Sequence, residues 1–397
     1  MSMLFNRLRV LISLTTYFMI LCFTLLGCHR TIPANKVEKT REIPVDTDTT
    51  ITLIFAGDMM GHTSQFTVAW NASEHCYQYD PCFRFVREIV SAADIACVNL
   101  EMTINDGPCS SFPFFSSPPA VLDALKNAGF DLLFTANNHI ADKGKTGIES
   151  TLSKIQQRGL LFTGSALDSA QRDTISPLLI EAKGLKIAFL NYTYGTNGMP
   201  VHSPHTVNVS NRQKILGDLH KADSMGAQVK IMYVHWGVEY QRNSHAGQRE
   251  FAQFLADNGV DLIIGGHPHV VQEVDSLCVP NREPVCCFYS LGNFLSNQRQ
   301  QYCNESLLAK VVLHKKTGKV LSISYIPLFS YRGNIDGVYQ HYVIPIYDYM
   351  RNPDRFGFNQ WEHSKICFAH KDLKTNISAE PDSSFSSTSP LCYDWKY

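Results

Sequence analysis

The sequence predicts an α/β fold, because short apolar runs alternate with segments of helical spacing from about residue 50 to residue 270. The apolar runs are nearly continuous, which is typical of strands whose two faces are both covered. A chain of 397 residues can form one large α/β domain or two or three smaller ones. The sequence shows no internal repeat.

Each expected element is an apolar run with one of two spacings. Continuous runs predict strands at 51–56, 95–98, 131–136, 187–192, 229–234 and 260–264. Apolar residues three or four apart predict helices at 83–91, 120–128, 147–158, 212–225 and 248–258. After about residue 276 the helical pattern fades, and a hairpin-rich region is expected to contain strands at 285–290, 307–313 and 319–326. The aromatic segment from about 337 to 368 is expected to be irregular.

The composition excludes several classes of protein. Hydrophobic residues make up 44% of the chain and charged residues 18%, which is typical of a globular protein and not of a disordered one. The formal net charge is -1, so there is no overall basic field to bind nucleic acid, and no nucleic-acid partner is expected. A polyanionic partner would have to bind at a local cationic site.

The N-terminus resembles a bacterial export signal. Arg7 and Arg9 precede 18 residues without charge, and this run ends in Leu25-Leu26-Gly27-Cys28. Residues 1–28 are therefore expected to be a lipoprotein signal peptide with Cys28 as the lipidated residue. The alternative is an uncleaved signal anchor, since about 18 apolar residues can just span a bilayer. Both interpretations predict an extracytoplasmic, membrane-anchored protein of the cell envelope.

The chain contains 12 cysteines, and in an oxidising compartment some of them could form disulfides. Cys76 and Cys82 are near neighbours in sequence, and Cys278 and Cys303 flank a second group. The alternative is that they are buried free thiols. The spacing of the cysteines does not decide between the two.

Polar residues with metal-binding side chains follow the predicted strands. They are Asp58, Asn99 and Glu101, Asn137, Asn138 and His139, His235, and His267 and His269. In open α/β sheets, ligands bind beyond the carboxyl ends of the strands. Carboxylates, imidazoles and amide oxygens together suit a divalent metal, and two such ions can activate water and stabilise a leaving oxygen. Each residue alone is equally consistent with a turn or a helix cap, but the joint pattern predicts a metal site.

The most specific motif is the pair His267 and His269, separated by Pro268. In extended backbone, two residues spaced i and i+2 point to the same side. Gly265, Gly266 and Pro268 also suit a tight turn at this point.

These motifs together resemble the CapA-type proteins linked to bacterial capsule and poly-gamma-glutamate synthesis. The resemblance covers about residues 50–300. The matching runs are Gly57-Asp58-Met59-Met60, Asn99-Leu100-Glu101, Ala136-Asn137-Asn138-His139, His235-Trp236-Gly237 with Glu239-Tyr240, Gly266-His267-Pro268-His269-Val270, and Tyr289-Ser290-Leu291-Gly292-Asn293-Phe294. The resemblance implies a calcineurin-like metallophosphoesterase fold, a layered β-sheet sandwich flanked by helices.

The resemblance also implies roles for individual residues. Asp58 and His269 would bind one divalent ion, and Glu101 would bridge to a second ion. That second ion would be bound by Asn138, His235 and His267, and the metals would be manganese, zinc or iron. His139 would be the acid that protonates the leaving group. The residues expected to bind substrate are Asn99, Asn137, Trp236, Glu239 and Asn293.

The sequence departs from the wider phosphoesterase pattern at three positions. The usual Asp-x-His is here Asp58-Met59-Met60, so one metal loses a histidine ligand. Glu101 stands where the bridging residue is usually aspartate, and Ile140 stands where an acid is common. His62 would replace the missing histidine only if its loop folds back toward the site.

The domain organisation follows from these features. We expect a signal peptide at 1–28, a tether at 29–48, a CapA-like metallophosphoesterase domain at 49–335 and a C-terminal extension at 336–397. The extension contains a Ser/Thr-rich stretch at 376–390, which is expected to lack fixed structure.

The leading functional hypothesis is an exported, membrane-tethered protein of capsule biosynthesis, with metal-assisted hydrolysis or transfer on an anionic polymer such as poly-gamma-glutamate. Its partners would include other capsule-synthesis membrane proteins. The alternatives are a non-catalytic polymer-binding or export component and a periplasmic phosphodiesterase. Basic residues near the site motifs could bind polymer carboxylates or could simply be solvated, and they are Lys143, Lys145, Arg242, His245 and Arg249.

Overall fold

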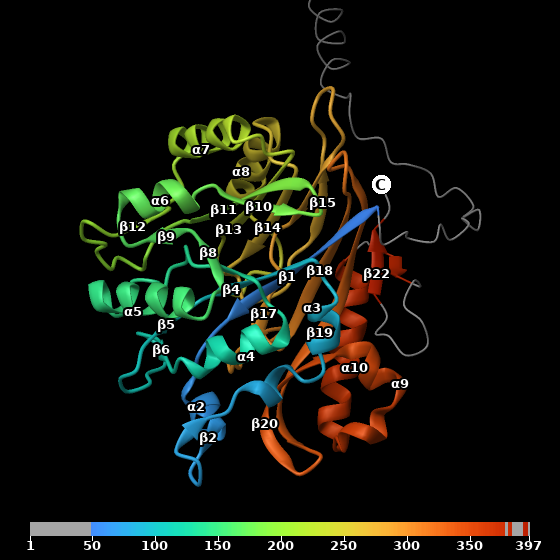
Figure 1. Cartoon of the computed structure of the whole chain (residues 1–397). Helices are drawn as coiled ribbons and strands as arrows, with labels where there is room; N and C mark the ends of the chain where they lie inside the picture. Colours follow the sequence, from blue (N-terminus) through green and yellow to red (C-terminus); the bar gives the residue numbers. More distant parts are fainter. Residues whose placement is uncertain (1–48, 378–379, 383–391, 396–397) are drawn as a thin grey trace, which may run out of the picture. The chain divides into compact units, whose positions relative to one another are not determined.

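The computed structural model describes residues 49–377, 380–382 and 392–395. The predicted signal peptide with Cys28, the tether at 29–48 and most of the Ser/Thr-rich stretch lie outside the described residues. The order of elements along the described chain is shown in Figure 1.

The first of two large sheets is built around β1 (Thr50–Met59), which is central and buried. On one side of β1 the strands run parallel to it, in the order β4 (Ile95–Leu100), β7 (Leu132–Phe134) and β8 (Leu161–Thr163). On the other side the chain returns in antiparallel strands, β18 (Glu305–His314), β19 (Val320–Ile335) and β20 (Val338–Pro345). β17 (Asn293–Leu295) pairs in parallel with the carboxyl end of β1, and β21 (Glu380–Asp382) and β22 (Cys392–Trp395) extend the sheet beyond β19.

The second sheet has a parallel centre and antiparallel edges. Its parallel strands are β11 (Leu185–Thr193), β13 (Val229–His235), β14 (Leu262–Gly266) and β16 (Val285–Phe288). Its edges are β10 (Leu178–Ala182), antiparallel to β11, and β15 (Val274–Leu277), antiparallel to β16.

The strands alternate their side chains between two cores. In β1, Leu53 and Phe55 lie in the core between the sheets, whereas Ile54 lies in the core under the helices. In β13, Tyr233 lies between the sheets, whereas Met232 lies on the helix side. Because both faces of these strands are covered, their sequences are continuously apolar.

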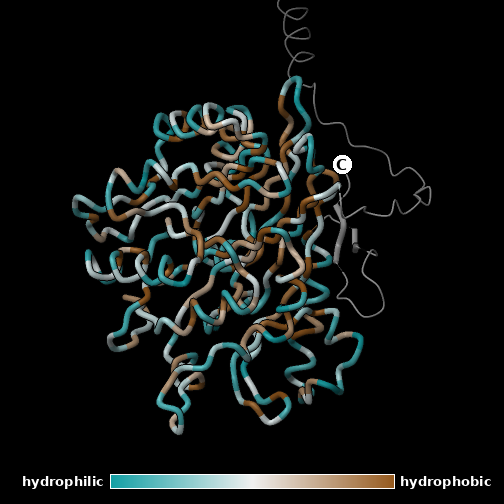
Figure 2. Tube along the Cα trace, in the orientation of Figure 1, coloured by the Kyte–Doolittle hydropathy of each residue, from teal (hydrophilic) through white to brown (hydrophobic). Residues whose placement is uncertain are grey.

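Helices cover the outer faces of both sheets (Figure 1). The first sheet is covered by α2 (Thr63–Ala69), α3 (Arg87–Ser91), α4 (Ala120–Ala128) and α5 (Gly144–Gln157), and the second by α7 (Arg212–Ser224) and α8 (Ala246–Asp257). In Figure 2 the hydrophobic colouring is concentrated along the strands, inside the helical layers. The structure therefore confirms the predicted α/β class and the layered sandwich flanked by helices.

The segment that follows β19 is regular, so the expectation of an irregular region at 337–368 is wrong. It contains β20, α9 (Ile346–Arg351), a short helix at Pro353–Phe356 and α10 (Gln360–Asn376). Tyr342, Tyr349 and Ile366 join the core between the sheets. α10 begins where the Asn359 side chain accepts hydrogen bonds from the amides of Trp361 and Glu362, which is a strong N-cap.

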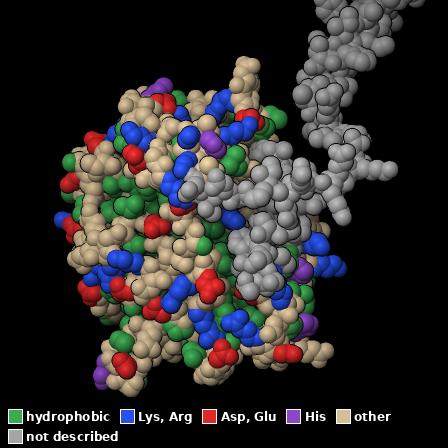
Figure 3. All heavy atoms as spheres, turned by 45° about the vertical axis from the view of Figure 1, so that its right-hand side comes forward, with side chains coloured by type: hydrophobic (Ala, Val, Ile, Leu, Met, Phe, Trp, Pro, Cys, Tyr) green, Lys and Arg blue, Asp and Glu red, His purple; other side chains and the backbone are tan. Residues whose placement is uncertain are grey.

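The surface carries mixed charge, in keeping with the net charge of -1. On the face shown in Figure 3, acidic and basic side chains are interspersed. Of the helices in the described ranges, none is both long and apolar enough to cross a membrane.

The cysteines considered for pairing are free thiols in the structure. Cys76 and Cys278 are exposed, and Cys82 and Cys303 are buried. Burial raises the pKa of Cys303 to about 12, so this thiol is uncharged at neutral pH.

Candidate metal centre

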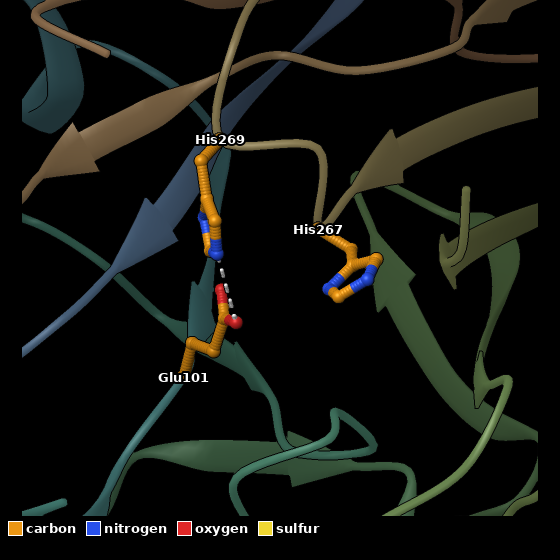
Figure 4. Close-up of side chains that lie close together, drawn as sticks. All are labelled: Glu101, His267 and His269. Atoms are coloured by element: carbon orange, nitrogen blue, oxygen red, sulfur yellow. Dashed lines mark ion pairs between the residues drawn. The ribbon is translucent and has the colours of Figure 1, made fainter. Parts of the chain in front are cut away.

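The carboxyl ends of β1, β4, β13 and β14 meet at one edge of the two sheets and bring five potential ligands together. Their ligand atoms form two groups, each with all its atoms within 4.8 Å of one another, and both groups are buried. One group is Glu101, His267 and His269, and the other is Asp58, Glu101 and His235. Glu101 belongs to both groups, so it lies at the middle of the cluster. Figure 4 shows His269 pointing at Glu101, with His267 beside them on the turn after β14.

Asp58 is held from three directions. The Asn99 side-chain amide donates to Oδ1 at 2.8 Å, the Tyr233 hydroxyl donates to Oδ1 at 3.3 Å, and the His267 backbone amide donates to Oδ2 at 3.0 Å. Burial by itself would raise the pKa of Asp58, but the hydrogen bond and charge of His269 outweigh it, and the pKa lies below its usual range. Asp58 is therefore a carboxylate at neutral pH.

Glu101 is fully buried, and neither of its carboxylate oxygens has a hydrogen-bond partner among the described residues. His235 Nε2 lies 3.4 Å and His269 Nε2 lies 3.8 Å from Oε1. Burial, and next the charge of Asp58, raise the pKa of Glu101 well above its usual range. An orphaned buried carboxyl group is costly, and a cation between these residues would remove that cost. The residues present therefore fit a metal ion.

His235 is held by two asparagines. Its Nε2 lies 2.8 Å from Asn138 Oδ1, and its Nδ1 lies 3.3 Å from Asn99 Nδ2. Burial lowers the pKa of His235 to about 3, so the ring is neutral, which is the form that binds metal. Asn138 follows β7 of the first sheet and His235 ends β13 of the second, so this pair of candidate ligands spans both sheets.

His267 and His269 lie on a turn and not on extended backbone, which corrects the expectation from their spacing. Their φ angles are 97° and 60°, in the left-handed region that non-glycine residues rarely adopt. The turn places the two rings 5.9 Å apart, with His267 Nδ1 buried and without a hydrogen-bond partner among the described residues. Such backbone strain persists where the surrounding structure enforces it, as at functional sites.

His269 differs from the other histidines of the cluster in its charge. Its Nδ1 lies 3.3 Å from Asp58 Oδ2. Burial acts to lower the pKa of His269, but Glu101 and Asp58 raise it more, to about 9. In the metal-free protein this ring is therefore protonated at neutral pH.

Gly266 allows the close approach of the two sheets at the site. A Cβ atom there would lie 2.2 Å from the Tyr233 hydroxyl and 2.5 Å from Asp58 Oδ1. No side chain fits in this position without displacing Asp58 or Tyr233.

His139 lies beside the ligand cluster and is oriented by Asp142. Its Nδ1 is 2.8 Å from Asp142 Oδ2, and the same oxygen accepts a hydrogen bond from the Phe115 amide at 2.7 Å. The His139 ring packs edge-on against Phe115, with centroids 4.6 Å apart. Nε2 has no partner among the described residues, so it is the nitrogen available for proton transfer.

The five residues expected to bind substrate lie in different surroundings. Asn99 and Asn137 are buried beneath the ligands, and Asn137 donates to Asn99 Oδ1 and to the carbonyl of Leu100. The ring of Trp236 lies in the core under α8, and its Nε1 donates to the Tyr289 carbonyl. The buried Asn293 donates to Gln298 and to the Cys303 carbonyl. Glu239 alone among the five is half-exposed.

The loop after β1 does not fold back to supply the missing histidine. Met60 is buried in the core under the helices. Both ring nitrogens of His62 face serine hydroxyls, with Nδ1 3.3 Å from Ser111 Oγ and Nε2 3.1 Å from Ser296 Oγ. His62 is therefore a neighbour of the cluster and not one of its ligands in this structure.

Tyr194 is a residue of the site that the sequence reasoning missed. Its ring centroid lies 4.7 Å from that of His267, and its hydroxyl donates to Asn197, which also accepts from Asn138. The side chain is 46% exposed, so it forms part of the rim. Its position directly after β11, at the carboxyl end of a predicted strand, is the signal that would have identified it.

The strand ends of the two sheets bring buried carboxylates, amides and histidines together around Glu101, which has no hydrogen-bond partner among the described residues. This arrangement defines an α/β protein with a candidate metal centre. Residues 52–298 match the family described as "Bacterial capsule synthesis protein PGA_cap". The match spans more than half of the chain, so the chain belongs to this family. This finding confirms the resemblance drawn from the motifs.

Individual relatives agree with the family match. The chain is 26% identical over 291 residues to the capsule biosynthesis protein CapA of Bacillus anthracis, covering 70% of this chain and 67% of the relative. It is 28% identical over 295 residues to the PGA biosynthesis protein CapA of Bacillus subtilis, and the match covers 72% of this chain and 74% of that relative.

Two solved structures are similar over most of the chain at low sequence identity. The NAD nucleotidase of Haemophilus influenzae is 12% identical with a TM-score of 0.47, and the match covers 83% of this chain and 57% of the nucleotidase. A calcineurin-like phosphoesterase of Bacillus subtilis is 12% identical with a TM-score of 0.40, and the match covers 82% of this chain and 97% of the phosphoesterase.

Proposed function

We propose that the protein is an exported, membrane-tethered, metal-dependent hydrolase or transferase of capsule biosynthesis, acting on an anionic polymer such as poly-gamma-glutamate. The family match and the relatives named for capsule and PGA biosynthesis support the pathway and the class of substrate. The export signal in the sequence supports the extracytoplasmic location and the anchoring through Cys28 or through the uncleaved signal.

The observation that carries the metal-dependent activity is the buried carboxylate of Glu101, which has no hydrogen-bond partner in the described part of the chain and belongs to both candidate ligand groups. The residues that would hold divalent ions, whether manganese, zinc or iron, are Asp58, Glu101, Asn138, His235, His267 and His269. Such ions supply an activated water and stabilise a leaving oxygen.

The remaining residues orient the site and move protons. His139 Nε2 would donate a proton to the leaving group, and Asp142 fixes the ring through Nδ1. Asn99 holds both Asp58 and His235, so it sets the spacing between a carboxylate and an imidazole from different sheets.

A second candidate function is a non-catalytic polymer-binding or export component on the same fold. The burial of Met60, at the position where the wider phosphoesterase pattern has a histidine, favours it. This arrangement removes one imidazole from the ligand set.

The test is metal analysis of the purified protein together with turnover on poly-gamma-glutamate and on a simple phosphodiester. Glu101→Gln removes the shared ligand, and Glu88→Gln on the exposed face of α3 is the control. Bound metal with turnover of the polymer, both lost in Glu101→Gln alone, supports the hydrolase or transferase. Metal and polymer binding without turnover supports the second candidate, turnover of the phosphodiester alone contradicts the polymer substrate, and a metal-free wild type contradicts the metal centre.

A further inference from the structure

The basic residues near the site motifs are mostly engaged within the protein. Arg242 forms an ion pair with Asp372 and lies over the ring of Tyr302. Arg249 donates to the Ser244 carbonyl, and His245 accepts from the amide of Gln248 at the start of α8. Lys145 lies 3.8 Å from Glu149. Carboxylates of a polymer would have to compete with these partners.

Two other arginines, Arg299 and Arg332, are exposed, and their side chains form no ion pair or hydrogen bond with any described residue. They contrast with Arg158 and Arg172, each of which is paired with an aspartate. An exposed guanidinium group without a carboxylate is free to bind one from a ligand.

Arg299 is anchored to the wall of the metal centre. Its neighbour Gln298 accepts a hydrogen bond from Asn293 at 2.9 Å and donates to the Tyr240 hydroxyl at 3.2 Å. The ring of Tyr240 in turn lies 6.0 Å from that of His269. Gln298, which directly precedes Arg299, thus contacts Tyr240, and Tyr240 lies beside the candidate ligand His269.

Arg332 lies on the same side of β19 as Ser330, since residues i and i+2 of a strand share a face. The Ser330 hydroxyl donates to the Ser296 carbonyl at 3.4 Å, and Ser296 Oγ is the partner of His62 Nε2. Through Ser330 and Ser296, the face of β19 that carries Arg332 connects to the loop beside the metal centre.

The buried His341 lies close enough to both Arg332 and Arg299 for their charges to affect it. His341 on β20 is the cross-strand partner of Arg332, and its Nε2 lies 3.0 Å from Ser64 Oγ. Burial, followed by the charges of Arg332 and Arg299, lowers the pKa of His341 to about 3. The two arginines thus act on the same buried group, as expected if they create a local positive field.

His62 links this surface to the proton donor. Its ring packs edge-on against Phe115, with centroids 5.3 Å apart, and Phe115 packs against His139. Packing and hydrogen bonds therefore connect His139 through Phe115 and His62 to Ser296 and Ser330, so the strand that carries Arg332 is fixed relative to the metal centre.

We propose that Arg299 and Arg332 form a subsite that binds carboxylate groups of the anionic polymer next to the metal centre. This inference rests on the proposed function, since it takes the polymer as the ligand. A polymer with a carboxylate on every unit can present groups to two separated guanidinium groups at once, and each guanidinium can form a bidentate contact. Both arginines lie beyond the residues 52–298 that match the family.

The test is equilibrium binding of poly-gamma-glutamate to the wild type, Arg299→Gln, Arg332→Gln and the double variant. The control is Lys316→Gln, which removes one exposed positive charge at the β18–β19 turn, beside the amino end of β1 and away from the site. We expect each single variant to weaken binding by roughly two- to fivefold and the double variant by about tenfold, as for exposed ion pairs. Added salt should weaken binding by the wild type more than by the double variant.

The outcomes separate this inference from the proposed function. If the wild type binds the polymer and the double variant binds it equally well, the subsite is wrong and the polymer substrate stands. If the wild type does not bind the polymer, the proposed substrate itself is wrong. An equal loss of binding in Lys316→Gln would also overturn the subsite, since it would show a general charge effect.

Discussion

Asn191 of β11 accepts a hydrogen bond from the backbone amide of Ala136, at 2.6 Å. Asn191 belongs to the second sheet, and Ala136 directly precedes Asn137, Asn138 and His139 at the edge of the first. The Asn191 amide also donates to the carbonyls of Ala136 and Tyr233, both at 3.3 Å. One buried side chain thus joins the two sheets where the candidate ligands and the candidate proton donor begin.

The first prediction concerns His139. His139→Ala should lower turnover by at least about a hundredfold, because a general acid contributes about 10²–10⁴ to a rate. Metal content and melting temperature should stay near those of the wild type, since His139 is not in either ligand group. Asp142→Asn should have a smaller effect on turnover, because the ring remains and only its orientation is altered. Normal hydrolysis by His139→Ala with normal metal content would remove His139 from the mechanism.

The second prediction is that metal affinity rises with pH up to about 9. The pKa of His269 is raised to about 9 in the metal-free protein, so below that pH a metal ion must displace its proton. The proton that His269 releases should make affinity rise by about tenfold per pH unit from neutral pH upward, and the rise should be steeper where Glu101, whose pKa is also raised, still holds a proton. If His269 had the ordinary histidine pKa of about 6.5, the metal affinity would stop rising near neutral pH.

Calorimetric titration with zinc or manganese, in buffers of different ionisation enthalpy, measures both the affinity and the proton release. His341→Gln changes a buried histidine outside the ligand groups and should leave the pH dependence unaltered. Affinity that is constant above neutral pH would contradict the assignment of His269.

The third prediction compares two glycines. Gly266→Ala should lower stability by about 1–3 kcal/mol and reduce metal content, because its Cβ would overlap the Tyr233 hydroxyl and Asp58. Gly217→Ala, in the exposed middle of α7 with nothing within 4 Å of the new Cβ, should instead raise stability by about 0.5–1 kcal/mol. Thermal unfolding of the two variants measures both changes in stability. Equal changes would show that the space around Gly266 does not exclude a Cβ atom.

The fourth prediction is that Cys28 is lipidated. Cys28→Ser should leave an unprocessed precursor that does not incorporate labelled palmitate, because the thiol is the acceptor of the lipid. The measurement is metabolic labelling followed by a mobility shift on a gel. Cys22→Ser, within the apolar run, is the matched control and should be processed normally. Equal labelling of Cys28→Ser would contradict lipidation at Cys28, and a wild type that is neither labelled nor processed would favour the uncleaved signal anchor.

Much of the fold could be predicted because the strands are buried on both faces. Their continuous apolar runs, such as those in β1 and β13, are visible in the sequence, and each was followed by a polar residue that the structure brings to the same edge. β20 could not be predicted in this way. Its residues Val338 to Pro345 mix exposed and buried positions, and its strand conformation depends on pairing with β19.

The candidate site, like the fold, could be predicted only in part from the sequence. The identity of the candidate ligands follows from residue type and position after a strand. The turn conformation of His267 and His269, the contacts of His62 with two serines and the charge on His269 depend on tertiary contacts that no spacing encodes. Trp236 was expected to bind substrate from its position after a strand, but such a residue can point toward the core as easily as toward the edge, and its ring lies in the core under α8.

The antiparallel pairing of β1 with β18 sets a lower limit on the length of an autonomous folding unit. A fragment that ends at residue 298, where the family match ends, would lose β18 and leave residues 50–56 of β1 with unpaired backbone groups along a hydrophobic edge. It would also strip Tyr325, Tyr342 and Ile366 from the core between the sheets. β1, the strand that carries Asp58, would then be an exposed and aggregation-prone sheet edge. A soluble fragment that contains the metal centre therefore has to extend at least through α10.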